Sequence, residues 1–106
     1  MDEQKVNETL ALGGNIELTG FKDIDNSKMV VLKKMVGNYV RKLSDSATNF
    51  ERLSLTMKSI GSETSNKYEV HGKLVCDGKV YATEVTDRNI FIVTDSVLKK
   101  IENSMK

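Results

Sequence analysis

The stretch KYEVHGKLVCDGKVYATEV, residues 67–85, decides the fold of this chain. It consists of two runs rich in β-branched and aromatic residues, and Asp77-Gly78 separates them. An Asp-Gly pair in this position is a strong hairpin signal, because the tight turn that matches strand twist needs a positive φ at both central residues. We therefore predict two antiparallel strands over residues 67–76 and 79–85.

The two sides of the first hairpin strand differ in polarity. Side chains alternate along a strand, so one side is apolar and carries Tyr68, Val70, Leu74 and Cys76. The other side is largely polar and carries Lys67, Glu69, His71, Lys73 and Val75. A lone hairpin is only marginally stable in water, so we expect further strands and a layer that covers the apolar side.

A short strand and an amphipathic helix are predicted before the hairpin. The residues NIELTG, from Asn15, alternate apolar and polar side chains and end at Gly20. A helix follows, and Asn26 or Ser27 is its candidate N-cap because either side chain accepts a hydrogen bond from a first-turn amide. Its apolar residues share one face: Met29, Leu32, Val36, Tyr39, Val40 and Leu43. The opposite face is a basic stripe: Lys34, Asn38, Arg41 and Lys42.

A third strand and a second helix flank the hairpin region. Residues 51–60 switch to a period of two, which predicts a half-buried strand, and GSETSNK (61–67) is typical of a polar loop. After the hairpin, a helical spacing relates Ile90, Val93, Val97, Ile101 and Met105. The outer face of this helix carries Asp95, Lys99, Glu102 and Lys106, with Lys100 at its flank.

The order β-α-β-β-β-α predicts an α+β fold. We expect a two-layer sandwich in which both helices cover one face of a four-stranded, mostly antiparallel sheet, as in double-stranded-RNA-binding domains. Residues 1–13 lack periodicity and are predicted to be a flexible tail, so that residues 14–106 form a single domain. The other face of the sheet is expected to be open to water or to a partner.

The composition limits the function classes. The chain has 106 residues and a net charge of +1, so any contact with nucleic acid needs a local basic patch. No apolar run is long enough to span a membrane, and the polar N-terminus is unlike a signal peptide. With one cysteine there is no internal disulfide. We expect a cytoplasmic protein without a membrane partner.

Few side chains are available for chemistry. The only histidine, His71, and the only cysteine, Cys76, fall on opposite faces of one strand, so a catalytic thiol-imidazole pair is not expected. A metal site at His71 has Glu69 as its one obvious partner on that strand. Tyr68 and Tyr81 alternate in phase with aliphatic residues, which favours core packing over base stacking. We predict a protein that is not an enzyme, with no metal, no cofactor and no small-molecule substrate.

Three stretches in this order of elements resemble the ribosome hibernation-promoting factors, also called ribosome-associated inhibitors of translation. NIELTG (residues 15–20) looks like the opening strand and turn of that family. YVRKL (39–43) is similar to the basic, amphipathic middle of its first helix, and NIFIVTD (89–95) is similar to the start of its last helix. The resemblance covers nearly everything in residues 15–106.

The resemblance implies a function in translation. Members of the family bind the small ribosomal subunit, in the channel where messenger and transfer RNA lie, and silence translation under stress. They contact ribosomal RNA mainly through basic residues on the helices, and the matching positions here are Arg41, Lys42, Lys99 and Lys100. The helical wheel and the loops add Lys22, Lys34 and Arg88 as candidate RNA-binding residues.

Two alternative functions stay open. The first is a double-stranded-RNA-binding module of similar core that acts away from the ribosome. The second is a protein-interaction or homodimerisation domain that uses the open face of the sheet and does not bind RNA. Sedimentation with small ribosomal subunits distinguishes the ribosome-binding hypothesis from both alternatives.

Overall fold

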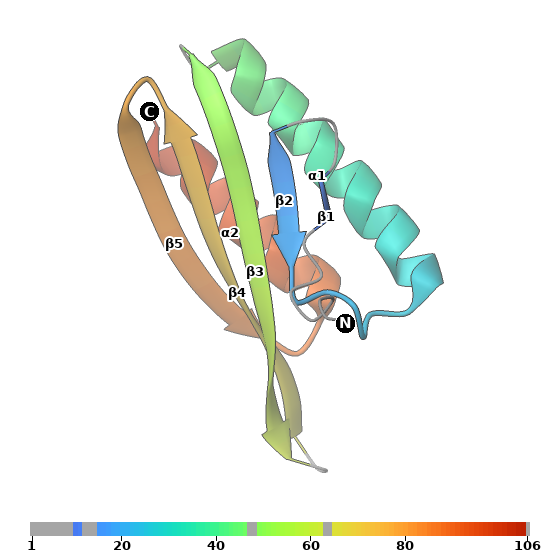
Figure 1. Cartoon of the computed structure of the whole chain (residues 1–106). Coiled ribbons are helices and arrows are strands. Elements are labelled where there is room, and N and C mark those ends of the chain that lie inside the picture. Colours follow the sequence, from blue (N-terminus) through green and yellow to red (C-terminus); the bar gives the residue numbers. More distant parts are fainter. Residues whose placement is uncertain (1–9, 12–14, 47–48, 63–64, 106) are drawn as a thin grey trace, which may run out of the picture.

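The computed structural model describes residues 10–11, 15–46, 49–62 and 65–105. The elements are β1 (Leu10–Ala11), β2 (Ile16–Thr19), α1 (Asn26–Ser46), β3 (Phe50–Ser62), β4 (Ser65–Cys76), β5 (Lys79–Asp87) and α2 (Ile90–Ser104). The strands form one sheet in the order β1-β2-β3-β4-β5, and both helices lie on one face of it (Figure 1). The predicted two-layer α+β fold is confirmed.

The sheet is mixed because α1 connects two neighbouring strands. β2 and β3 are parallel, as a helical crossover between them allows, whereas the other neighbouring pairs are antiparallel. The four predicted strands are β2 to β5. Two residues of the predicted N-terminal tail, Leu10 and Ala11, form β1 and pair with Leu18 and Glu17 of β2. Residues 1–9 and 12–13 of that tail lie outside the described residues.

The Asp-Gly turn forms as predicted. Asp77 has a φ of 52° and Gly78 a φ of 75°, and Cys76 pairs with Lys79 across the turn. This register places Val70 opposite Val85 and buries Val70, Leu74 and Cys76 against the helices. Tyr68 and Tyr81 pack at the margin of the same core, as predicted.

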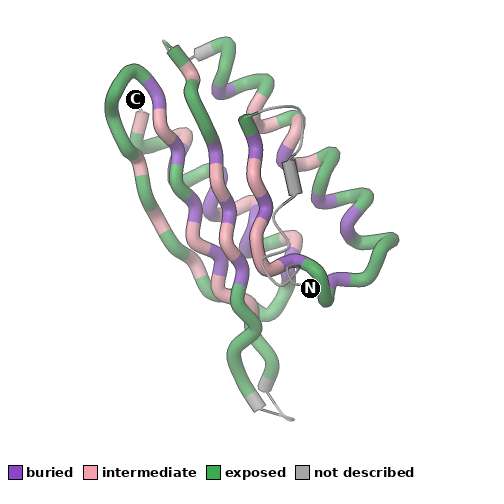
Figure 2. Tube along the Cα trace, in the orientation of Figure 1, coloured by how far each residue is buried: buried purple, intermediate pink, exposed green. Residues whose placement is uncertain are grey.

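The hairpin formed by β3 and β4 is longer than predicted. Residues 61–67 are not all loop, because β3 continues to Ser62 and β4 begins at Ser65, with Gly61 paired to Asn66 and Ile60 to Lys67. This end projects beyond the helices as an arm (Figure 1), and its described residues are exposed on both faces (Figure 2). An arm without a buried side has no apolar alternation, so the sequence pattern cannot reveal it.

The N-cap of α1 lies one residue before the first predicted candidate, Asn26. The carbonyl oxygen of Asp25 accepts hydrogen bonds from the amides of Lys28 and Met29, at 3.0 and 2.9 Å, so Asp25 occupies the N-cap position. Its carboxylate also accepts from the Ser27 hydroxyl at 2.6 Å. The cap residue is therefore Asp25, and the predicted candidates Asn26 and Ser27 lie inside the first turn.

The helix α2 packs closely on β4 at Gly72. A Cβ atom built on Gly72 would lie 2.4 Å from Val97 Cγ1 and 2.9 Å from Ile101 Cδ1. Only a residue without a side chain leaves room for α2 at this distance from the sheet. Within the described residues, neither helix is long and apolar enough to cross a bilayer.

Candidate nucleic-acid interface

The two helices are joined at a seam where polar side chains meet. The Tyr39 hydroxyl on α1 donates a hydrogen bond of 2.9 Å to the Asp95 carboxylate on α2. Lys42 Nζ lies 3.9 Å from Glu102 Oε2, and 4.9 Å from the centre of the Tyr39 ring. Burial raises the pKa of Tyr39 to about 12, with further contributions from Asp95 and Glu102. The helices are therefore held side by side in one layer.

The outer side of α1 is the most basic part of this layer. The helix contains five Lys and Arg residues and one acidic residue, Asp45. Lys34 and Arg41 are exposed and lie on the side away from the buried Leu32 and Val36. They are two turns apart, or about 10 Å along the axis. Lys34, Asn38 and Arg41 of the predicted stripe are therefore accessible on the outer face of α1. The prediction is wrong for Lys42, which lies at the seam beside Tyr39 and Glu102.

The predicted lysines of α2 do not join α1 in one uninterrupted patch. Lys99 Nζ lies 3.2 Å from Asp95 Oδ2. Lys100 is about 160° from Glu102 on the helical wheel, so it lies on the flank away from the seam. The seam between the two basic surfaces thus contains the carboxylates of Asp95 and Glu102. Lys106, which the sequence also places on this face, lies outside the described residues.

Two further cations lie near the N-terminal ends of both helices. Lys28 of α1 and Arg88, just before α2, line a small hollow of about 120 Å³ together with Tyr68 and residues 89–91. Asn89 caps α2: its side-chain oxygen accepts from the amides of Phe91 and Ile92 at 2.8 and 3.1 Å. The two cations and the positive ends of two helix dipoles favour an anion such as a phosphate here. The carboxylates of Asp25 and Asp87 lie at the same helix ends and oppose it, since Asp87 Oδ1 accepts from the Asn89 amide at 3.1 Å.

Sequence reasoning missed Lys28 as a part of this region. Its position in the first turn of a helix was visible, but its proximity to Arg88 depends on how the helices pack. Lys22 is exposed in the connection between β2 and α1. All seven predicted RNA-binding residues are exposed, and their role in binding stays a prediction: Lys22, Lys34, Arg41, Lys42, Arg88, Lys99 and Lys100.

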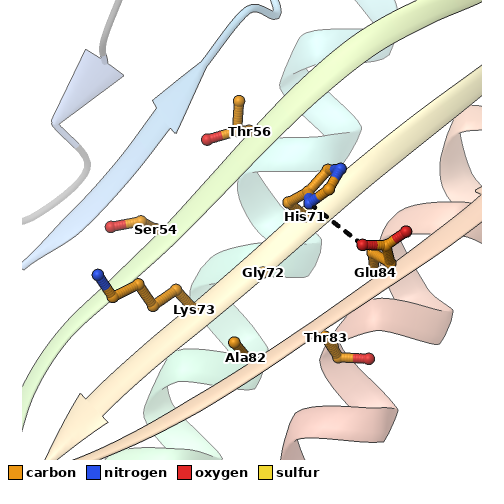
Figure 3. A pocket seen from close by; sticks show the side chains of 8 residues that line it. All are labelled: Ser54, Thr56, His71, Gly72, Lys73, Ala82, Thr83 and Glu84. Carbon is orange, nitrogen blue, oxygen red and sulfur yellow. Dashed lines mark ion pairs between the residues drawn. The ribbon is translucent and has the colours of Figure 1, made fainter.

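The open face of the sheet contains a shallow hollow of about 530 Å³ (Figure 3). His71 lies in it, between Thr56 of β3 and Glu84 of β5, its direct cross-strand neighbours. His71 Nδ1 is 3.7 Å from Glu84 Oε1, and His71 Nε2 is 3.4 Å from Glu69 Oε1. Sequence reasoning named Glu69 but missed Glu84, although the hairpin register set by Asp77-Gly78 already places Glu84 opposite His71.

Glu69, His71 and Glu84 are close enough together to be metal ligands, but their ligand atoms do not converge on one point. Their ligand atoms lie within 4.8 Å of one another. The two carboxylates, however, approach opposite nitrogens of the imidazole ring, whereas one ion needs both beside the same nitrogen. The His71 and Glu84 side chains are 44% and 64% exposed. The arrangement suits an imidazole between two carboxylates, and we assign no metal to it.

Comparisons with known proteins identify no relative from which a function could be inferred. No protein-family model matches this chain, and no curated protein sequence matches it. The resemblance to ribosome hibernation-promoting factors therefore rests on the motifs and the order of elements described above.

Proposed function

We propose that this protein binds RNA of the small ribosomal subunit through its helical layer and inhibits translation in the cytoplasm, without catalysing a reaction. One observation carries the proposal: the Tyr39 to Asp95 hydrogen bond holds the two helices side by side on one face of the sheet. The exposed cations of α1 and those at the N-terminal ends of both helices consequently belong to one side of the molecule.

The distribution of charge supports binding to a polyanion. The whole chain has a net charge of +1, so no general field attracts RNA. The basic residues of α1 concentrate positive charge on one side, where each contact with a phosphate releases a condensed counterion. Affinity that depends on such contacts decreases steeply as the salt concentration rises.

The shape of the layer supports recognition of a duplex without base reading. A-form RNA presents its phosphates and 2′-hydroxyl groups across a wide, shallow groove, which side chains on a rigid surface contact by shape. The carboxylates of Asp95 and Glu102 repel phosphates from the seam. We therefore assign most of the contact to Lys34 and Arg41 of α1 and to Lys28 and Arg88 at the helix ends.

Sedimentation with purified small ribosomal subunits at low salt tests this assignment. The variant Lys34→Glu with Arg41→Glu is expected to reduce binding by at least about tenfold, because each reversal replaces an attraction to phosphate by a repulsion. The matched control is Lys67→Glu with Lys73→Glu, which makes the same change of net charge on the open face of the sheet. This control is expected to bind like the unchanged protein.

The other outcomes identify the alternative functions. If the unchanged protein binds an unrelated RNA duplex as tightly as the subunit, the ribosome is not its specific target. If the control variant loses binding and the helix variant keeps it, the interface is the open face of the sheet. Absence of sedimentation at any salt concentration contradicts the proposal as a whole.

A further inference from the structure

The two edges of the sheet differ in how they are protected. At one edge, the short β1 pairs with β2. At the other edge, among the residues that the structure describes, the sheet ends with β5 (Figure 1). This strand has nine residues, and its register with β4 has no shift or bulge. Natural proteins usually protect such an edge with proline, a bulge or inward charges. β5 contains no proline, and its charged residues are Lys79 and Asp87 at its ends and Glu84.

The hairpin turn determines which backbone groups β5 presents outward. In a hairpin with a two-residue turn, the residues that flank the turn form a hydrogen-bonded pair, so Cys76 and Lys79 exchange hydrogen bonds. Hydrogen-bonded pairs then recur at every second residue, and the odd-numbered residues of β5 bond to β4. The amides and carbonyls that face outward belong to Val80, Ala82, Glu84 and Thr86.

We propose that β5 pairs antiparallel with β5 of a second copy of this chain, about a twofold axis at Thr83. In this register every outward amide meets a carbonyl, because Val80 faces Thr86 and Ala82 faces Glu84 of the second copy. Lys79 faces Asp87 at both ends. Tyr81 faces Val85, a pairing of an aromatic with a β-branched side chain that stabilises sheets.

Neighbouring registers are less favourable. The hydrogen-bond ladder forms only in registers that pair outward-facing residues with each other. In the nearest such alternatives, the twofold axis lies at Ala82 or at Glu84 instead of Thr83. A centre at Glu84 places two glutamates face to face, and like charges directly opposite each other destabilise a sheet. A centre at Ala82 moves Lys79 opposite Val85 and leaves Asp87 without its partner. With the axis at Thr83, all nine residues of the two strands are paired, and opposite charges face each other at both ends.

The geometry of the pair keeps the helices accessible. A twofold axis perpendicular to the sheet joins the two sheets into one and leaves both helical layers on the same side. The inference depends on the strand edge alone and does not require that the helices bind RNA. Its failure and that of the proposed function are therefore distinguishable, since one is read from the mass in solution and the other from binding to ribosomal subunits.

Sedimentation velocity over a series of protein concentrations tests the dimer. The expected result is a species of twice the chain mass of 11.9 kDa. Lys79→Asp places like charges at both ends of the paired strands and is expected to raise the dimer dissociation constant about tenfold. The double variant Lys79→Asp with Asp87→Lys restores opposite charges and should restore dimerisation. The helix α2 keeps its cap in this variant because Asn89 supplies it.

A second variant removes backbone donors without a change of charge. Ala82→Pro deletes an outward amide at the edge, where proline is tolerated, and should abolish the dimer while circular dichroism stays unchanged. Two outcomes overturn the proposal. One is a monomer at every concentration up to about 1 mM. The other is a dimer that Lys79→Asp does not weaken, which places the interface elsewhere.

Discussion

Tyr39 of α1 and Asp95 of α2 are 56 positions apart in the sequence, and a hydrogen bond of 2.9 Å joins their side chains. Asp95 also pairs with Lys99, one turn further along α2. A single carboxylate therefore connects the two helices and holds one of the predicted RNA-binding lysines. The Asp95 carboxylate thus takes part both in the contact between the helices and in the charge of their surface.

Removing the hydroxyl of this tyrosine should destabilise the fold. Tyr39→Phe is expected to lower the free energy of unfolding by about 1 kcal/mol, because the lost bond has a charged acceptor but the acceptor is partly solvated. Urea denaturation measures the change. In a double-mutant cycle with Asp95→Ala, the two changes should be less than additive. Full additivity would mean that the hydroxyl and the carboxylate do not interact in solution.

The same contact predicts a loss of stability at alkaline pH. The pKa of Tyr39 rises from its ordinary value of 10.0 to about 12 in the folded chain, mainly through burial and then through the hydrogen bond to Asp95. Folding thus favours the neutral phenol. This contribution is complete below pH 10 and is lost as the pH rises from 10 to about 12. The stability of Tyr39→Phe should decrease less over this range, and equal pH profiles would contradict the shift.

Two glycines should respond in opposite directions to the same substitution. Gly72→Ala is expected to cost about 1 to 3 kcal/mol, since its methyl group would collide with Val97 and Ile101. Gly37→Ala in α1 meets no atom within 4 Å and should stabilise the chain by about 0.5 to 1 kcal/mol. Thermal denaturation compares the two variants. If Gly72→Ala is neutral, α2 does not pack on β4 at this distance.

The hairpin and the amphipathic helices are predictable because their signals are local. Asp77-Gly78 sets a register, and the apolar residues of each helix repeat on one face whatever lies nearby. The arm at the end of β3 and β4 is different, because Ile60 and Lys67 are both exposed and no alternation marks them. A pairing of this kind depends on the continued ladder and leaves no pattern in side-chain polarity.

The candidate interface was harder to predict than the fold. A helical wheel places Asp95 and Glu102 on the outside of α2, which is correct for an isolated helix. It does not show that this side faces α1, where the two carboxylates meet Tyr39 and Lys42. Likewise, Lys28 and Arg88 are 60 positions apart, and only the packing of the helix ends places them around one hollow.

Neutralising a seam carboxylate should strengthen the binding that we propose for the helical layer. Glu102→Gln removes a negative charge 3.9 Å from Lys42 Nζ and takes away a repulsion toward phosphates. An exposed ion pair contributes up to about 1 kcal/mol, so affinity for the small subunit at low salt should increase by up to about fivefold. Glu84→Gln makes the same charge change on the open sheet face and should leave affinity unchanged. If both variants show the same increase in affinity for the small subunit, net charge governs binding and the position of Glu102 at the seam has no effect.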